Sequence, residues 1–183
     1  VERFEYPPEA IREIIANAVI HRDYKLTGTY TQVNVFEDRL EVFNPGCLPP
    51  GVTVENIKFA QVSRNEVIAA LLKDMNYLEE YGRGIDIVFH SMKEWGLLDP
   101  IFKNTANSFR VILPGPELSK LNERQLVIWE HLVESDKVTI KECCNFLPEV
   151  PRTTINYDLQ KLQDIGLIRQ AGESINTYYT PAF

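Results

Sequence analysis

Three polar side chains near the start of the chain, Glu13, Asn17 and His21, recur at four-residue spacing within EAIREIIANAVIHRDY (9–24). Residues four apart lie one turn above another on one side of an α-helix. The Asn amide oxygen is a hard ligand that suits Mg²⁺ beside phosphates. A carboxylate one turn earlier can orient or deprotonate a water molecule that attacks phosphate. The row is therefore a candidate site for phosphate chemistry, and such a site also needs glycines that approach the phosphates.

The helix that carries this row is expected from Pro8 to Arg22, with Pro8 suited to its first turn. The polar row lies mostly opposite an apolar face that consists of Ile11, Ile14, Ile15, Ala18 and Val19. A solvated helix edge is one interpretation of the row. However, the far side also carries Ala10, Ala16 and Ile20, whereas an ordinary amphipathic helix has charged residues there. A second side of small and polar residues is typical of a pocket floor, which is the alternative interpretation.

Two glycine-containing turns are candidates to complete the site. The Asn-Pro-Gly turn at 44–46 follows the end of an expected strand, where glycine lets the backbone approach a ligand closely. The Gly-Arg-Gly turn at 82–84 precedes an apolar helix, and amides at a helix N-terminus can bind phosphate. The alternatives are a plain turn for the first and a plain helix cap for the second.

Other residues close to these motifs are interpreted as structural. The HRDY run at 21–24 is similar to the protein-kinase catalytic loop, but the rest of that signature is absent. We therefore expect His21 to satisfy backbone groups at the helix end. Arg64 either pairs with Glu66, which we favour, or reaches a phosphate. Cys47 is expected to be a small filler of its loop.

Composition limits the classes of function. The chain has 183 residues and a net charge of −7, which argues against broad nonspecific binding to nucleic acid but not against a local patch. No apolar run approaches the ~20 residues that a membrane-spanning helix needs. The three cysteines lack CxxC or zinc-ligand spacing, and a reducing cytoplasm is the expected location. Because the chain begins VERFEYPP without an initiator Met, we expect a fragment of a longer protein.

Helical and strand-like patterns alternate before residue 114. The expected elements are a helix at 8–22, strands at 29–36 and 39–43 around a Glu-Asp turn, a loop at 44–51, helices at 65–81 and 85–96, and a strand at 107–114. The first two strands are close enough in sequence to pair antiparallel. This order predicts an α+β sandwich of one sheet and one helical layer over residues 1–114.

A second domain is expected after a linker at 115–120, because a Pro-Gly-Pro run ends the preceding strand. Capping-box patterns at 122–125 and 139–142 mark the starts of two helices, the first of which is expected to run through Val133. A third helix at 152–165 has Ile155, Leu159, Leu162 and Ile165 on one face, with Gly166 as its stop. The expected hairpin then consists of LIRQ at 167–170, a turn at 172–174 and NTYYT at 176–180. Three helices and a hairpin predict a winged helix-turn-helix domain over residues 121–183.

The third helix is a candidate DNA reader, because in a helix-turn-helix this helix enters the major groove. The side chains that point away from its apolar face are Thr153, Asn156, Tyr157, Gln160 and Lys161. Asn and Gln can pair with adenine and Lys with guanine, while Arg152 and Arg169 are placed to contact phosphate. Residues 116–183 nevertheless carry seven Lys and Arg against ten Asp and Glu. A winged helix that makes protein contacts is therefore the alternative.

Four runs of sequence together resemble a family: YPPEAIREIIANAVIHRDY, DRLEVFNPGCLPPGVT, SRNEVIAALL and LEEYGRGIDIV. Over residues 4–114 the chain resembles the C-terminal module of the RecG-related bacterial transcriptional regulators of AlbA and Schlafen type. A trailing winged helix is usual in that group, and an AlbA-type domain usually lies upstream. The resemblance implies a DNA-binding transcriptional regulator, with DNA as a partner and a homodimer as an expected assembly.

That module in turn resembles the GHKL ATPase fold of the DNA gyrase B subunit, MutL and histidine kinases. The resemblance implies ATP and Mg²⁺ as cofactors, with Glu13 as the catalytic residue that activates water and Asn17 as the Mg²⁺ ligand. The nucleotide-binding positions that it implies are Asn17, Asn44, Gly46, Gly82, Arg83 and Gly84. Where that fold has an Asp that accepts a hydrogen bond from the adenine amino group, this chain has Asn44, and Pro45 removes one backbone amide.

Three functions are consistent with these patterns. The first is a DNA-binding transcriptional regulator with a nucleotide-binding sensor domain. The second is a Mg²⁺-dependent ATPase with weak turnover, and the third is an interaction scaffold with a degenerate nucleotide site. The chain has no GxxxxGK(S/T) phosphate loop, so the sequence does not support helicase activity.

Overall fold

The computed structural model describes residues 4–77, 83–172 and 177–182. The chain divides into two compact units, unit 1 at Val1–Ser119 and unit 2 at Lys120–Phe183. Each unit has its own set of buried apolar side chains. The described residues contain no helix that is long and apolar enough to span a membrane.

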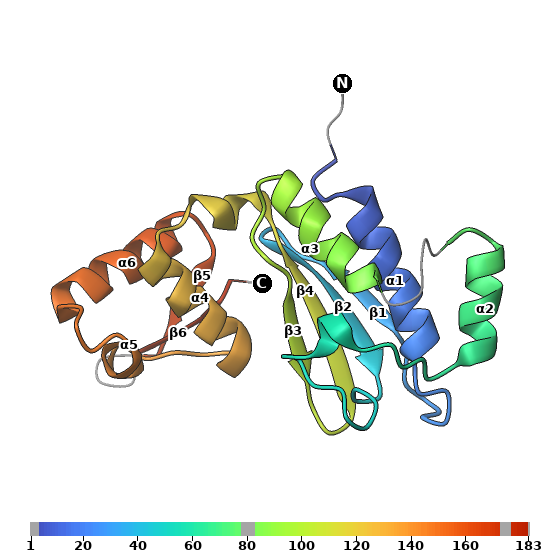
Figure 1. Cartoon of the computed structure of the whole chain (residues 1–183). Coiled ribbons are helices and arrows are strands. Elements are labelled where there is room, and N and C mark those ends of the chain that lie inside the picture. The colour runs from blue at the N-terminus through green and yellow to red at the C-terminus, as the bar shows by residue number, and fades with distance from the viewer. Residues whose placement is uncertain (1–3, 78–82, 173–176, 183) are drawn as a thin grey trace. The chain divides into compact units, whose positions relative to one another are not determined.

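The described residues of unit 1 form one antiparallel sheet and three α-helices in an α+β arrangement. Its helices are α1 (Pro8–His21), α2 (Glu66–Asp74) and α3 (Gly84–Glu94), with short 3₁₀ turns η1 (Ile57–Phe59) and η2 (Pro116–Lys120). The strands are β1 (Gln32–Val35), β2 (Arg39–Pro45), β3 (Ile101–Asn104) and β4 (Ser108–Pro114), in the spatial order β1-β2-β4-β3. Figure 1 shows α1 and α3 side by side across one face of this sheet.

The core of unit 1 lies between this helical pair and the sheet. Ile14 of α1 and Met92 of α3 are almost fully buried against Val42 of β2 and Leu113 of β4. Burying a side chain of this size removes apolar surface from water and contributes about 1.5–3 kcal/mol. The core therefore fixes α1 and α3 on the sheet, and these two helices carry Glu13, Asn17 and Gly84 of the candidate site.

Several expected elements of unit 1 are present, one expected helix ends earlier than predicted, and one strand was missed. The tight turn between the first two strands exists, because the Phe36 amide donates to the Arg39 carbonyl over 2.8 Å. The helix expected at 65–81 ends as α2 at Asp74, because Asn76 takes a left-handed conformation (φ 59°) that ends helices; the end of that prediction, 78–81, lies outside the described residues. β3 was not expected, since four residues give too short a pattern.

In unit 2 the part of the chain that the structure describes forms three α-helices and a two-stranded antiparallel sheet. They are α4 (Glu123–Ser135), α5 (Ile140–Phe146), α6 (Arg152–Asp164), β5 (Ile168–Ala171) and β6 (Tyr178–Pro181). Both capping boxes are confirmed, with Asn122 and Thr139 accepting from the amides of Gln125 and Glu142. The turn expected at 172–174 lies outside the described residues except for Gly172.

The interior of unit 2 is formed where α6 packs on its neighbours. Ile155, Leu159 and Leu162 are fully buried as expected, whereas Ile165 is 54% exposed because α6 has already ended at Asp164. Asp158 of α6 is also fully buried. Its carboxylate accepts from Arg124 Nε (2.7 Å) and Gln125 Nε2 (3.2 Å), so this carboxylate joins the N-terminus of α4 to α6.

Candidate functional site

The polar row of α1 lies in the middle of the buried side of that helix. Glu13 is only 4% exposed, and Asn17 and His21 are half-buried. Ala16 and Ile20, on one flank of the row, are buried, whereas Ile15 of the expected apolar face is 40% exposed. The solvated-edge interpretation is therefore wrong, because α1 buries the side that carries its polar residues.

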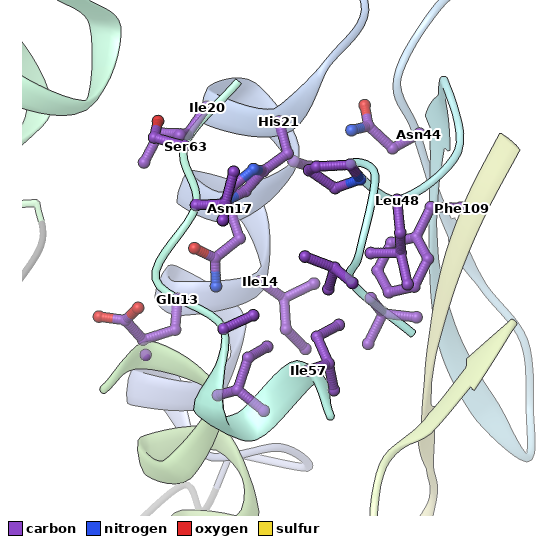
Figure 2. Close-up of a pocket in the computed structure, with 18 of the residues that line it drawn as sticks. Glu13, Ile14, Asn17, Ile20, His21, Asn44, Leu48, Ile57, Ser63 and Phe109 are labelled. Atoms are coloured by element: carbon purple, nitrogen blue, oxygen red, sulfur yellow. The ribbon is translucent and has the colours of Figure 1, made fainter. Parts of the chain in front are cut away.

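The row lines a pocket of about 150 Å³ in unit 1. The pocket is bounded by Val42 and Phe109 of the sheet, by Gly84 and Ile85 of α3, and by Leu48 of the loop after β2. Figure 2 shows Glu13, Asn17 and His21 following one another along α1 beside this space. Most of the lining is apolar, so the few polar groups must determine what the pocket accepts.

One end of the pocket is where α3 begins. Gly84 is the first residue of α3, and a Cβ added there would collide with Glu13 Oε2 and lie 3.3 Å from Asn17 Nδ2. The side chains of Glu13 and Asn17 therefore face the positive end of the α3 dipole, where helices bind anions. Arg83 precedes α3 as its exposed N-cap and does not line the pocket, and Gly82 lies outside the described residues.

Asn44 of β2 lines the pocket but already has a partner. Asn44 is only 4% exposed, and its Oδ1 accepts a hydrogen bond from Thr31 Oγ1 over 2.9 Å. The amide oxygen that the resemblance assigns to the adenine amino group is thus shared with a hydroxyl. The contact with Thr31 was not expected, because Thr31 is thirteen residues away along the chain.

Gly46 and Arg64 form a structural contact beside the pocket and do not line it. Gly46 has φ +99°, and the Arg64 guanidinium lies where a Cβ would be. Arg64 Nη2 donates to the Cys47 carbonyl (2.5 Å), and Nη1 lies 3.8 Å from Asp23 Oδ2. The favoured pairing of Arg64 with Glu66 was therefore wrong, because the guanidinium turns toward the loop after α1.

Backbone carbonyls at the C-terminal end of α1 accept hydrogen bonds from the side chain of Asn65 and not from that of His21. Asn65 Nδ2 donates to the carbonyls of Ile20 (2.6 Å) and Arg22 (2.9 Å). His21 Nδ1 is buried with no hydrogen-bond partner in the described structure, and Ser63 Oγ shares this property. Burial and the positive charge of Arg64 lower the pKa of His21. The expected helix-end role of His21 was wrong, and its imidazole contributes to the pocket instead.

The donor set of the pocket fits one hard cation that is shared with a ligand. Among the described lining residues, Glu13 is the only formally charged one. No group of three or more His, Cys, Asp or Glu that could hold a metal occurs in the described part of the chain. Mg²⁺ typically keeps several waters and takes one or two protein oxygens plus phosphates. Glu13 and Asn17 supply oxygens of this kind.

A second candidate site is the outer face of α6. All seven residues expected to contact DNA are exposed: Arg152, Thr153, Asn156, Tyr157, Gln160, Lys161 and Arg169. Lys161 Nζ lies 5.6 Å from the centre of the Tyr157 ring, while Gln160 Nε2 donates to Asp164 Oδ1 (2.8 Å). The face is therefore polar and accessible, with one acidic residue at its end.

Comparisons with known proteins give one family match within unit 1 and one similar structure over nearly the whole chain. Residues 28–113 match the family described as "Putative ATP-dependent DNA helicase recG C-terminal". No curated protein matches. The crystal structure of the DIP2311 protein from Corynebacterium diphtheriae is similar, with a TM-score of 0.58 and 23% identity over 97% of this chain. The chain spans 39% of that structure's length, and at this identity the likeness concerns the fold alone.

The residues that match the family include only part of the candidate site. It includes Asn44 and the turn at 82–84, whereas α1 with Glu13 and Asn17 precedes its first residue. The match therefore supports an ATPase-like domain of the RecG C-terminal type within unit 1.

Proposed function

We propose that this chain is part of a DNA-binding transcriptional regulator whose first domain binds an adenine nucleotide with Mg²⁺. Residues 1–114 act as the GHKL-like sensor domain, and residues 121–183 act as a winged helix-turn-helix domain. The observation that carries the proposal is the position of Glu13 and Asn17, which face the start of α3 at Gly84 in one apolar pocket.

The two ends of this pocket suit different parts of a nucleotide. Asn17 would hold Mg²⁺ beside the phosphates and Glu13 would activate a water molecule there, since both side chains lie at the N-terminal end of α3. The whole pocket, at about 150 Å³, has room for one ring, because a cavity of about 150 Å³ accommodates benzene. A base would thus enter the pocket while the phosphates extend toward α3. The Mg²⁺ ion would supply charge neutralisation for the phosphates.

Calorimetric titration of the chain with Mg·ADP tests nucleotide binding. We expect saturable one-site binding that is lost when EDTA removes Mg²⁺. Absence of binding at millimolar Mg·ADP would contradict the proposal and would favour the scaffold with a degenerate site. Mg·GDP serves as the comparison ligand, because it carries the same phosphates on a different base.

The proposed DNA contact is supported by the exposed face of α6 and by the order of three helices and a hairpin in unit 2. In a winged helix-turn-helix this helix would enter the major groove. Asp158, which would oppose DNA by its charge, is buried and bonded to Arg124. The pair removes one positive and one negative charge, so residues 116–183 keep their acidic balance, and a DNA contact would depend on the exposed Arg152, Lys161 and Arg169.

Fluorescence anisotropy with duplex DNA from the promoter of the gene itself tests this contact. Each Lys or Arg that neutralises a phosphate contributes about 0.9 to the slope of log affinity against log salt. We expect Lys161→Ala to weaken binding several-fold, whereas Lys141→Ala on α5 serves as a matched exposed control. Equal binding by the two variants, or no binding by the wild type at low salt, would contradict DNA recognition by α6.

A further inference from the structure

Two residues that line the pocket, His21 and Ser63, each have a buried side-chain atom without a hydrogen-bond partner in the described structure, namely Nδ1 and Oγ. Leaving a buried polar group unpaired costs about 1–3 kcal/mol, and most such groups in proteins are paired. The other atoms of this kind, on Tyr6, Arg22 and Arg64, belong to residues that do not line the pocket. Two residues that line the pocket therefore carry hydrogen-bonding capacity that no other group of the described protein uses.

These two atoms lie at the opposite end of the row from Glu13. Asn65, two residues after Ser63, donates to the Ile20 carbonyl at the C-terminal end of α1. Figure 2 shows Ser63 beside Ile20 and the His21 end of the helix, with Glu13 at the other end of the row. The pocket thus has a carboxylate-and-amide end beside α3 and an imidazole-and-hydroxyl end beside Ser63.

The imidazole end is suited to a neutral polar group. Burial and Arg64, the charged group that acts on this imidazole, lower the pKa of His21, so the ring is neutral near pH 7. A neutral imidazole has one nitrogen that accepts a hydrogen bond. Asn44 is less available as an acceptor, because its Oδ1 is already bonded to Thr31.

We propose that His21 is the specificity-determining residue of the pocket, whose unpartnered Nδ1 accepts a hydrogen bond from an amino group on a nitrogen-heterocyclic base. Ser63 supplies a second, adjustable hydrogen bond to the same ring, because its hydroxyl both donates and accepts. The inference rests on the proposed nucleotide binding, and it assigns recognition of the base to His21 in place of Asn44.

Two ligands and three proteins test this inference by calorimetry. The ligands are Mg·ADP and the Mg complex of purine riboside 5′-diphosphate, which lacks the amino group. Losing one net hydrogen bond should weaken wild-type binding by about 2- to 10-fold. In His21→Phe the two ligands should bind equally. His90→Phe, at an exposed position of α3, should keep the wild-type preference.

The outcomes separate this inference from the proposed function. If the wild type binds both diphosphates equally, or if His21→Phe keeps the preference, the role of His21 is overturned while nucleotide binding stands. If the wild type binds neither ligand, both proposals fail. Should His21→Phe fold poorly by circular dichroism, His21→Asn replaces it: its amide retains an acceptor near the Nδ1 position and is expected to keep part of the preference.

Discussion

The polar rows of α1 and α6 have similar helical spacing but opposite surroundings. In α1, Glu13 and Asn17 are enclosed by α3, the sheet and the loop after β2. In α6, Asn156 and Gln160 are exposed, and the carboxylate on the inner side, Asp158, is bonded to α4. The role of a row of polar residues on a helix can therefore be inferred only when it is known what packs against that side of the helix.

The contrast extends to the two buried carboxylates. Asp158 accepts hydrogen bonds from side chains at the start of α4, so its role is to join two helices. Glu13 faces a pocket and the glycine that begins α3. We expect substitution of Asp158 to change the stability of unit 2 and substitution of Glu13 to change chemistry in unit 1.

The largest expected effect is on catalysis, if the pocket turns over ATP. Glu13→Gln keeps the size of the side chain but removes the base, and general-base catalysis contributes about 10²–10⁴-fold. Phosphate release from Mg·ATP should therefore fall at least 100-fold, while Mg·ADP binding remains. Wild-type turnover no greater than that of the variant would exclude the ATPase alternative and leave a binding pocket only.

The next effect concerns the joint between α4 and α6. Asp158→Asn replaces an acceptor that receives several hydrogen bonds, each worth about 0.5–1.5 kcal/mol, or up to about 3 kcal/mol when charged. We expect unit 2 to lose about 2 kcal/mol of unfolding free energy, measured by urea titration of the fluorescence of buried Trp129. Asp164→Asn, at the exposed end of α6, is the control and should change stability by about 0.5 kcal/mol or less. Equal effects of Asp158→Asn and Asp164→Asn would contradict the role of Asp158 in joining α4 to α6.

A smaller effect on stability, with a specific effect on the site, is expected for Gly84→Ala. The added Cβ collides with the end of the Glu13 side chain, which can move, and alanine favours the helix by up to about 1 kcal/mol. The free energy of unfolding should therefore change by about 1 kcal/mol or less, whereas Mg·ADP affinity should fall. Unchanged affinity would show that the start of α3 is a plain helix cap.

The smallest effect is a dependence of unit 1 stability on pH. The folded-state pKa of His21 lies below 6.5, so the unfolded chain binds the proton more readily. Stability should thus decrease as pH falls below 6.5 and through the lowered folded-state pKa. Thermal melts of wild type and His21→Phe between pH 7.5 and pH 5 measure this, and the variant should have the flatter profile. Parallel profiles would contradict a buried, neutral His21.

Local patterns were predicted well from the sequence because they depend on neighbours in the chain. Both capping boxes of unit 2 and the Glu-Asp turn were recognised in this way. The burial of the α1 row was not decided, because it depends on α3 and on the loop after β2, which lie more than twenty residues away. The same reason hid the contacts of Arg64 with Asp23 and of Asn44 with Thr31.

The most direct test of the account is the thermal stability of wild type and Asn17→Ala with and without Mg·ADP. A ligand at 100 times its dissociation constant stabilises the folded state by about 2.7 kcal/mol. The account predicts a rise in the melting temperature of the wild type and little or none in Asn17→Ala. Equal shifts in the two proteins, or no shift in either at millimolar Mg·ADP, would contradict a nucleotide site built on the polar row of α1.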